Sequence, residues 1–248
     1  MYGEKSMKES QLIIIIFVVI VICKLYQIIK ERTDYKKTSY FQITGNKYSE
    51  VHNDKGKAGE FLIYRKLRDY EKTGTKFLFN CYLNKDNGQT TEIDVIMIHN
   101  TGMFVFESKN YTGWIFGSEK NTNWTQTLPV GRGKPAQKNS FYNPVKQNQQ
   151  HIYHLRNMIG EDIPIYSIIV FSDNCVLKDV SVTSSMAYVI QIYQLQETIN
   201  AIIQYNQQYP QTYNVNKIYD TLYPCTQVSE QIKQQHIESI NNHNFQRK

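Results

Sequence analysis

The chain of 248 residues has a mass of 29.2 kDa, enough for one domain with a buried core and too little for two independent enzymes. Charged residues make up only 20% of the sequence, so this is not a charge-driven disordered chain. The net charge of +6 suits an anionic partner, and four widely spaced cysteines without a CxxC pair argue against a zinc ribbon, a thioredoxin-like redox site and a disulfide framework.

An apolar stretch near the N-terminus predicts a single transmembrane helix over residues 12–29. Residues 12–23 carry no polar side chain other than the Cys23 thiol, and the Lys24 ammonium is able to snorkel to the membrane interface. A cleaved secretory signal is the alternative, but residues 1–10 are charge-balanced and no small-residue cleavage site follows. Basic residues follow the helix, which predicts a single-pass protein of the cell membrane with its C-terminal domain in the cytoplasm. These residues are Lys24, Lys30, Arg32, Lys36 and Lys37.

The rest of the chain divides into a basic juxtamembrane linker over 30–53, a folded domain over 54–206 and a polar, partly helical tail over 207–248. Apolar periodicity within the domain predicts helices near 56–72, 144–159 and 194–206, and strands near 76–84, 91–99, 102–110, 113–118, 123–128, 163–171 and 187–192. Strands lying between helices indicate an α/β (α+β) fold with a mixed central sheet flanked by helices. Residues 127–141 combine Gly, Pro and basic side chains, which is typical of a mobile surface loop.

The most informative stretch, residues 91–111, predicts a β-hairpin closed by an HNTG turn. If the hairpin closes symmetrically about residues 100 and 101, Asp94 lies opposite Glu107 and Glu92 lies opposite Lys109. Because residues i and i+2 share a face of a strand, these four side chains are expected on one side of the sheet.

Two opposed carboxylates in such a hairpin predict a site for a divalent cation. Directly opposed Cβ atoms are about 4.5–5.5 Å apart, a distance at which two carboxylates repel unless a cation lies between them. Oxygen-only ligands suit a hard ion such as Mg²⁺, which lowers the pKa of bound water and neutralises charge on a phosphate. Lys109 is placed to orient or deprotonate the attacking water, or to stabilise the transition state. Asp94, Glu107 and Lys109 together predict phosphodiester hydrolysis.

The alternative is a solvated strand face, since an acid-x-Lys triplet such as Glu107-Ser-Lys109 is common by chance. The remaining side chains on the face that carries the charges are apolar, namely Ile96, Ile98, Met103 and Val105. The other face is expected to be filled by Ile93, Val95, Met97, Phe104 and Phe106. Charged groups on an otherwise buried face need partners, which favours a cleft over an open surface.

The ordered runs GKAGE (56–60), EIDVIM (92–97), FVFESKNY (104–111), GWIFGS with NWTQ, and NPVKQNQQHIYHL (143–155) resemble the nuclease-related domain of many bacterial proteins. That domain is a relative of the PD-(D/E)xK phosphodiesterases, and the resemblance covers about residues 54–170. It implies a restriction-endonuclease-like fold. Ile93 stands where the name of the superfamily has proline, a residue that does no chemistry.

The resemblance also implies roles for individual residues. Asp94 and Glu107 would be ligands of Mg²⁺ or Mn²⁺, and Lys109 would be the catalytic lysine. Glu60 would be an additional acidic site residue, and Gln147 a polar site residue. Many members of this group have no demonstrated activity, so the resemblance supports the fold more firmly than the reaction.

The residues themselves are compatible with these added roles and also with simpler ones. Glu60 shares a helical stripe with Tyr64 and Leu67, which turns it toward the sheet, but an acid in a first helical turn also interacts favourably with the helix dipole. Gln147 falls in the first turn of a helix that Asn143 is suited to cap, so capping and solvation alone would explain both residues.

Two further sequence features are weaker indications of function. His151 and His154, three residues apart on a Gln-rich helix, are expected to be exposed. The segment 131–134 lacks the spacing of a phosphate-binding P-loop, although with Lys138 it forms a basic loop suited to a nucleic acid backbone.

The leading hypothesis is therefore a membrane-anchored, Mg²⁺-dependent nuclease-like protein whose substrate is DNA or RNA. The alternative is a catalytically inactive nuclease-fold module that binds nucleic acid or a protein partner at the membrane. In either case the basic residues of 24–37 are expected to hold anionic lipid headgroups, at about 1 kcal/mol each.

Overall fold

The computed structural model of the chain describes the backbone of residues 2–131, 133–160, 162–209 and 211–246. Side chains are described for the same residues except 2–10, 12, 13 and 241–246.

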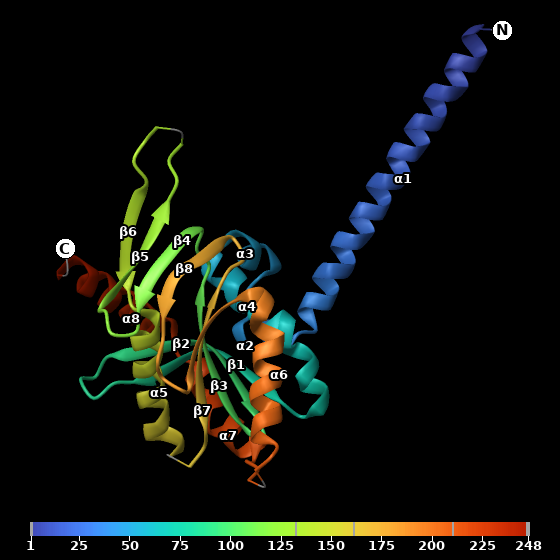
Figure 1. The fold of residues 1–248 in the computed structure, drawn as a ribbon. Helices are drawn as coiled ribbons and strands as arrows, with labels where there is room; N and C mark the ends of the chain where they lie inside the picture. The colour runs from blue at the N-terminus through green and yellow to red at the C-terminus, as the bar shows by residue number, and fades with distance from the viewer. Residues whose placement is uncertain (1, 132, 161, 210, 247–248) are drawn as a thin grey trace.

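The described residues begin with helices, continue with six strands, one helix and three more strands, and end with helices (Figure 1). The helices are α1 (Tyr2–Lys36), α2 (Ser39–Thr44), α3 (Tyr48–Asn53), α4 (Lys55–Leu67), η1 (Arg68–Thr73), α5 (Pro144–Ile159), η2 (Ile192–Gln194), α6 (Leu195–Asn206), α7 (Val215–Leu222), η3 (Tyr223–Thr226) and α8 (Glu230–Gln246). The strands are β1 (Lys76–Asn84), β2 (Thr90–His99), β3 (Gly102–Lys109), β4 (Gly113–Ser118), β5 (Asn123–Leu128), β6 (Gln137–Tyr142), β7 (Ile165–Phe171), β8 (Cys175–Ser181) and β9 (Ala187–Gln191).

The strands build two mixed sheets. The larger sheet has the order β1-β2-β3-β7-β9, with antiparallel pairing from β1 to β3 and parallel pairing from β3 through β7 to β9. The smaller sheet has the order β6-β5-β4-β8, with β4 and β8 parallel. The predicted mixed α/β fold with flanking helices is confirmed, and β8 is a strand that the sequence pattern did not predict.

Helices cover both faces of the larger sheet. On one face, which we call the α4 face, α4 and α6 pack on four buried side chains of the central hairpin, Val95, Met97, Phe104 and Phe106. On the other, the α5 face, α5 and α7 pack on Ile96, Ile98, Met103 and Val105. These eight residues lie on the faces predicted from sequence, because alternation along the strands determines which side chains each face receives. Ile93 was predicted on the same face as Val95 and Met97 but belongs to the core of the α5 face.

The β2–β3 hairpin has the predicted register. Val95 pairs with Phe106 and His99 pairs with Gly102, so the hairpin closes symmetrically about residues 100 and 101. Gly102 is required at the turn because its φ is +152° and a Cβ atom there would lie 3.0 Å from the Pro164 carbonyl oxygen.

The folded unit extends beyond 54–206 at both ends. Tyr35, Tyr40 and Val51, from the segment predicted to be a linker, are buried in the core of the α4 face. Ile218 and Leu222 of α7, from the predicted tail, are buried in the core of the α5 face. The linker is rich in tyrosine and polar residues, so its periodicity did not reveal that its aromatic rings bury against Phe61 and Phe79.

The predicted transmembrane helix over 12–29 is not supported. These residues belong to α1, which extends away from the rest of the chain in Figure 1. Within the described part of the chain, no helix combines the length and the apolar character needed to cross a membrane. The predicted segment begins at Leu12 and Ile13, whose side chains lie outside the described residues.

The predicted loop over 127–141 is partly a strand. β6 pairs with β5 from Asn123 and Tyr142 to Leu128 and Gln137, and the described residues of the connection, 129–131 and 133–136, belong to no strand. The base of the smaller sheet is tightly packed, because Trp124 is buried against Gly117, where a Cβ atom would overlap the indole ring.

Candidate functional site

The predicted catalytic residues meet where the β2–β3 ladder ends. Val95 and Phe106 form the last β2–β3 pair at this end. Beyond this pair, the Asp94 side chain instead of its backbone contacts β3. Its Oδ2 atom accepts a hydrogen bond of 2.8 Å from the Ser108 backbone N–H. Asp94 is thereby held beside the segment that carries Glu107 and Lys109.

Glu107 lies between two basic side chains. Its Oε1 atom is 2.7 Å from Nζ of Lys109, and its Oε2 atom is 3.3 Å from Nε2 of His151. Oε2 of Glu107 and Nε2 of His151 are both buried, and neither has a hydrogen-bond partner among the described residues. Burial acts to raise the pKa of Glu107, but the Lys109 ammonium and His151 outweigh it and leave the pKa lowered. Glu107 is therefore an ionised carboxylate with a buried oxygen that has no hydrogen-bond donor.

Lys109 connects β3 to α5. Its ammonium also donates a hydrogen bond of 3.2 Å to Oε1 of Gln147. Gln147 lies in the first turn of α5. As predicted, Asn143 caps this helix: its side chain accepts hydrogen bonds from the backbone N–H groups of Val145 and Lys146. Burial acts to lower the pKa of Lys109, but the charge and hydrogen bond of Glu107 leave it raised. The lysine is therefore protonated at neutral pH.

Glu60 enters from the opposite side of the sheet, on α4. Its side chain is buried, and Oε2 accepts hydrogen bonds of 3.2 Å from the Tyr40 hydroxyl and 3.1 Å from the Asn80 amide. Gly59 brings this turn of α4 against β3, since a Cβ atom there would overlap Oγ of Ser108. Burial is the main cause that raises the pKa of Glu60 to about 7.

The acids influence one another electrostatically. The pKa of Asp94 is well above its ordinary value, first because the carboxyl group is buried and then because Glu107 and Glu60 lie near it. Lys109 and the Ser108 N–H partly oppose this rise. Like-charge repulsion among carboxylates is what a bound cation would relieve.

Glu92 differs from the prediction. It was expected on the same side as Glu107, but side-chain alternation breaks at Asn80, which has a φ of +49° and is passed over in the β1–β2 pairing between Phe79 and Cys81. On the far side of this break Thr91 faces α5, where its hydroxyl is 2.7 Å from Nδ1 of His151. Glu92 turns instead into a pocket that Glu60 also lines.

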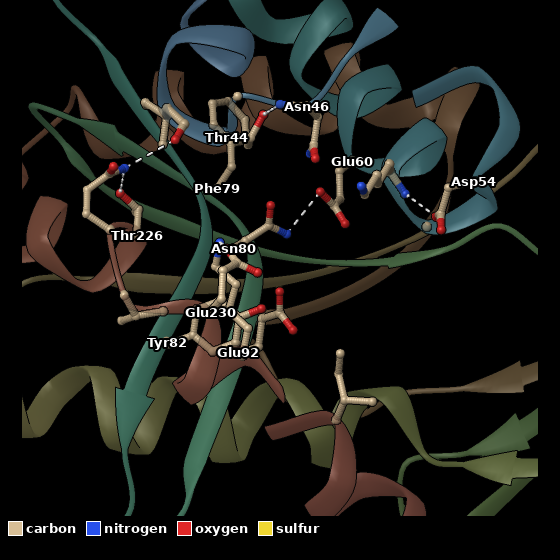
Figure 2. Close-up of a pocket in the computed structure, with 18 of the residues that line it drawn as sticks. Thr44, Asn46, Asp54, Glu60, Phe79, Asn80, Tyr82, Glu92, Thr226 and Glu230 are labelled. Atoms are coloured by element: carbon tan, nitrogen blue, oxygen red, sulfur yellow. Dashed lines mark hydrogen bonds and ion pairs between the residues drawn. The ribbon is translucent and has the colours of Figure 1, made fainter. Parts of the chain in front are cut away.

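This pocket has a volume of about 660 Å³ and a strongly polar lining (Figure 2). Figure 2 shows Asn80 reaching Glu60 across it, with Glu92 and Tyr82 below. Helix α8 supplies one wall through Glu230, Lys233, Gln234 and Ile237. Asp94, Glu107 and Lys109 are not among the residues that line the pocket.

Two histidines in the site were missed or misjudged from sequence. His151 was expected to be exposed, but only 5% of it is accessible, because it packs between Glu107 and Thr91. Its position four residues after Gln147 places both on one face of α5, a signal that was available in the sequence. His236 of α8 is also buried, with Nε2 3.6 Å from Oε2 of Glu92.

Comparison with known proteins identifies the family of the chain. Residues 55–172 match the nuclease-related domain, a range that runs from α4 through β7 and includes η1, β1, the central hairpin, the smaller sheet except β8, and α5. An uncharacterized Bacillus anthracis protein is 36% identical over 188 residues, which are 76% of this chain and 84% of that protein. The chain belongs to the nuclease-related domain family. The matched range agrees closely with the predicted 54–170.

The donor chemistry of this nuclease-related domain fits a hard divalent cation. Asp94 and Glu107 provide oxygen ligands, one Glu107 oxygen is buried without a hydrogen-bond donor, and the pKa of Asp94 is raised by its acidic neighbours. In the part of the chain that the structure describes, however, no three His, Cys, Asp or Glu side chains converge as a ready-made metal site. Any such ion would rest on one or two carboxylates with water in its other positions, as is usual for Mg²⁺.

Proposed function

We propose that this nuclease-related domain hydrolyses phosphodiester bonds of nucleic acid in a Mg²⁺- or Mn²⁺-dependent reaction. One observation carries the proposal: a buried Glu107–Lys109 ion pair lies beside the raised-pKa acid Asp94 at the end of the central hairpin, and Glu60, from the opposite side of the sheet, acts electrostatically on Asp94. Buried acids with perturbed pKa values beside a buried lysine are a common feature of catalytic sites that handle phosphate and a cation.

Lys109 is proposed to act by its charge. Since its pKa is raised and it remains protonated, it suits stabilisation of negative charge on the phosphoryl oxygens better than removal of a proton from water. Gln147 is proposed as a positioning residue, because its hydrogen bond fixes where the ammonium lies. His151 is proposed to hold Glu107 from the other side, which fixes the carboxylate between two basic groups.

Asp94 and Glu107 are the residues proposed to hold the ion. When bound, Mg²⁺ or Mn²⁺ supplies a water of lowered pKa and neutralises charge on the phosphate. Glu60, whose pKa is about 7, is proposed to add negative charge near Asp94 as the pH rises through neutrality. These roles follow the restriction-endonuclease-like arrangement that the family resemblance implies.

The test uses the full chain with labelled DNA and RNA, in Mg²⁺, Mn²⁺ or EDTA, beside Asp94→Ala. We expect cleavage of at least one nucleic acid with a divalent ion, none in EDTA and none by the variant. The exposed substitution Glu197→Ala on α6 is the matched control and should leave the rate unchanged. Cleavage that persists in Asp94→Ala would overturn the mechanism.

A second candidate is a noncatalytic module that keeps the nuclease fold to bind nucleic acid or a protein partner. The observation in its favour is that the Lys109 ammonium pairs with one oxygen of Glu107 while Nε2 of His151 lies 3.3 Å from the other. Calorimetry separates the two functions: an active site should bind Mn²⁺ with an affinity that Glu107→Gln weakens, whereas the noncatalytic module should show no such binding.

We also propose that the protein attaches to a membrane through the basic stretch over 24–37. Its lysines and arginine are suited to anionic headgroups on the cytoplasmic side. Liposome flotation with the five basic residues changed to Gln tests this attachment, and flotation that is unchanged and independent of anionic lipid would refute it.

A further inference from the structure

Positive charge is concentrated in one continuous segment. Residues 120–160 contain six Lys or Arg and no Asp or Glu, which equals the net charge of +6 of the whole chain. The remaining residues hold 22 basic and 22 acidic side chains. β5, β6 and α5 with their connections therefore form a basic segment without an acidic residue, separate from the basic stretch over 24–37.

The β5–β6 hairpin carries part of this charge away from the domain. Figure 1 shows the hairpin reaching past the other strands of the molecule. Lys134 at its tip and Lys138 on β6 are exposed, and neither forms an ion pair with a described acidic residue. An edge strand often carries lysine to prevent pairing with another sheet, but that explains only Lys138, because Lys134 lies outside the strand.

The surface of the hairpin is polar rather than apolar. Asn139 donates a hydrogen bond of 3.2 Å to Gln126 across the two strands, and Gln137 donates one of 3.1 Å to Asn139. Amide side chains in this arrangement can exchange their mutual hydrogen bonds for those of phosphates or base edges. A polar, cationic ribbon suits nucleic acid better than it suits an apolar protein surface.

The base of the hairpin is fixed to the candidate site. The Asn143 amide donates to the carbonyl oxygens of Ser118, Glu119 and Asn121, while its Oδ1 caps α5. Four residues further along α5, Gln147 holds Lys109. A ligand bound along the hairpin would therefore lie at a defined position relative to the Glu107–Lys109 pair.

We propose that the β5–β6 hairpin is an arm that binds duplex DNA, with Lys134 and Lys138 contacting backbone phosphates. The proposal rests on the function proposed above and names its substrate class. A two-stranded ribbon fits the major groove of B-form DNA, about 12 Å wide, whereas the deep, narrow major groove of A-form RNA excludes it. Six-residue strands extend about 20 Å, enough to reach into such a groove.

The experiment measures binding of the full chain to a short fluorescent duplex DNA by anisotropy, over a series of salt concentrations. All samples contain EDTA, so cleavage plays no part in the readout. The test variant is Lys134→Gln with Lys138→Gln. The control variant is Lys66→Gln with Lys217→Gln, which removes the same charge from exposed positions on α4 and α7.

We expect the arm variant to bind duplex DNA at least tenfold more weakly at low salt, and the slope of log affinity against log salt to fall by about 1.8, at about 0.9 per lost phosphate contact. The control variant should keep most of the affinity and slope, and duplex RNA should bind more weakly than duplex DNA.

Equal losses in both variants, no loss in the arm variant, no binding by the unmodified chain, or an arm-dependent affinity for anionic vesicles rather than DNA would each overturn the proposal. Failure of the arm is distinguishable from failure of the nuclease function, since the latter is judged by Asp94-dependent cleavage with a divalent ion.

Discussion

Replacing Glu60 by Gln should make the stability of the protein less dependent on pH. In the folded state burial raises the pKa of this carboxyl group from its ordinary value of 4.5 to about 7. Between these two values the unfolded chain loses the proton of Glu60 while the folded chain keeps it. Stability therefore falls as the pH rises from about 4.5 to 7 and stays lower above that window.

The size of the effect follows from the shift. One pKa unit corresponds to 1.36 kcal/mol, so a rise from 4.5 to about 7 amounts to about 3 kcal/mol of lost stability at pH 8. A Gln side chain keeps one oxygen to accept the hydrogen bonds of Tyr40 and Asn80 but carries no charge. The free energy of unfolding of Glu60→Gln, relative to that of the unmodified chain, should therefore increase by up to about 3 kcal/mol as the pH rises from 4.5 to 8.

Urea unfolding of both proteins in EDTA at several pH values measures this difference. The exposed substitution Glu197→Gln on α6 is the control and should show no comparable pH dependence. A Glu60→Gln stability difference that is the same at pH 4.5 and pH 8 would refute the reasoning, because it would mean that Glu60 ionises alike in the folded and unfolded chains.

Further predictions concern thiol reactivity and packing. The Cys225 thiol, whose pKa is lowered to about 7 chiefly by the neighbouring Cys81 thiol, should be alkylated by iodoacetamide with a half-maximal rate near pH 7, and Cys81→Ala should move that midpoint upward. A midpoint above pH 8 in the unmodified chain would contradict this. Gly117→Ala should destabilise the protein by about 1–3 kcal/mol and alter its near-ultraviolet circular dichroism, because the new methyl group would overlap the Trp124 ring. An unchanged spectrum and an unchanged melting temperature would show that Gly117 and Trp124 are not packed in this way. Asn148→Ala should lower the free energy of unfolding in urea by about 1–3 kcal/mol, because the buried amide donates hydrogen bonds of 2.9 Å to the Val105 carbonyl oxygen and the Ser167 hydroxyl. A decrease of less than about 0.5 kcal/mol would argue against these hydrogen bonds.

Local signals in the sequence predicted the central hairpin and the helix that follows the smaller sheet. The alternation in 91–110 and the HNTG turn were enough for the β2–β3 register, since a slip by one residue would have turned the apolar side chains out of the core. Asn143 and Pro144 were enough for the start of α5, because the cap and the proline both act within the first turn.

Long-range contacts determine what the sequence did not reveal. The break in alternation at Asn80 depends on a left-handed backbone conformation that Asn tolerates but that no short pattern announces, and it redirects Glu92 into the pocket. His151 is buried only because Glu107 and Thr91, far away in sequence, converge on it. The aromatic residues of α2 and α3 were similarly concealed in a polar segment.

The rate of nucleic acid cleavage by Asp94→Asn, by Glu107→Gln and by the double variant, each with Mn²⁺ under single-turnover conditions, tests most directly whether these two acids form one catalytic site. If they do, each single variant should lose nearly all activity and the double variant should lose no more, because residues that act as a unit are not additive. Full activity in either single variant, or losses that multiply in the double variant, would contradict a shared site.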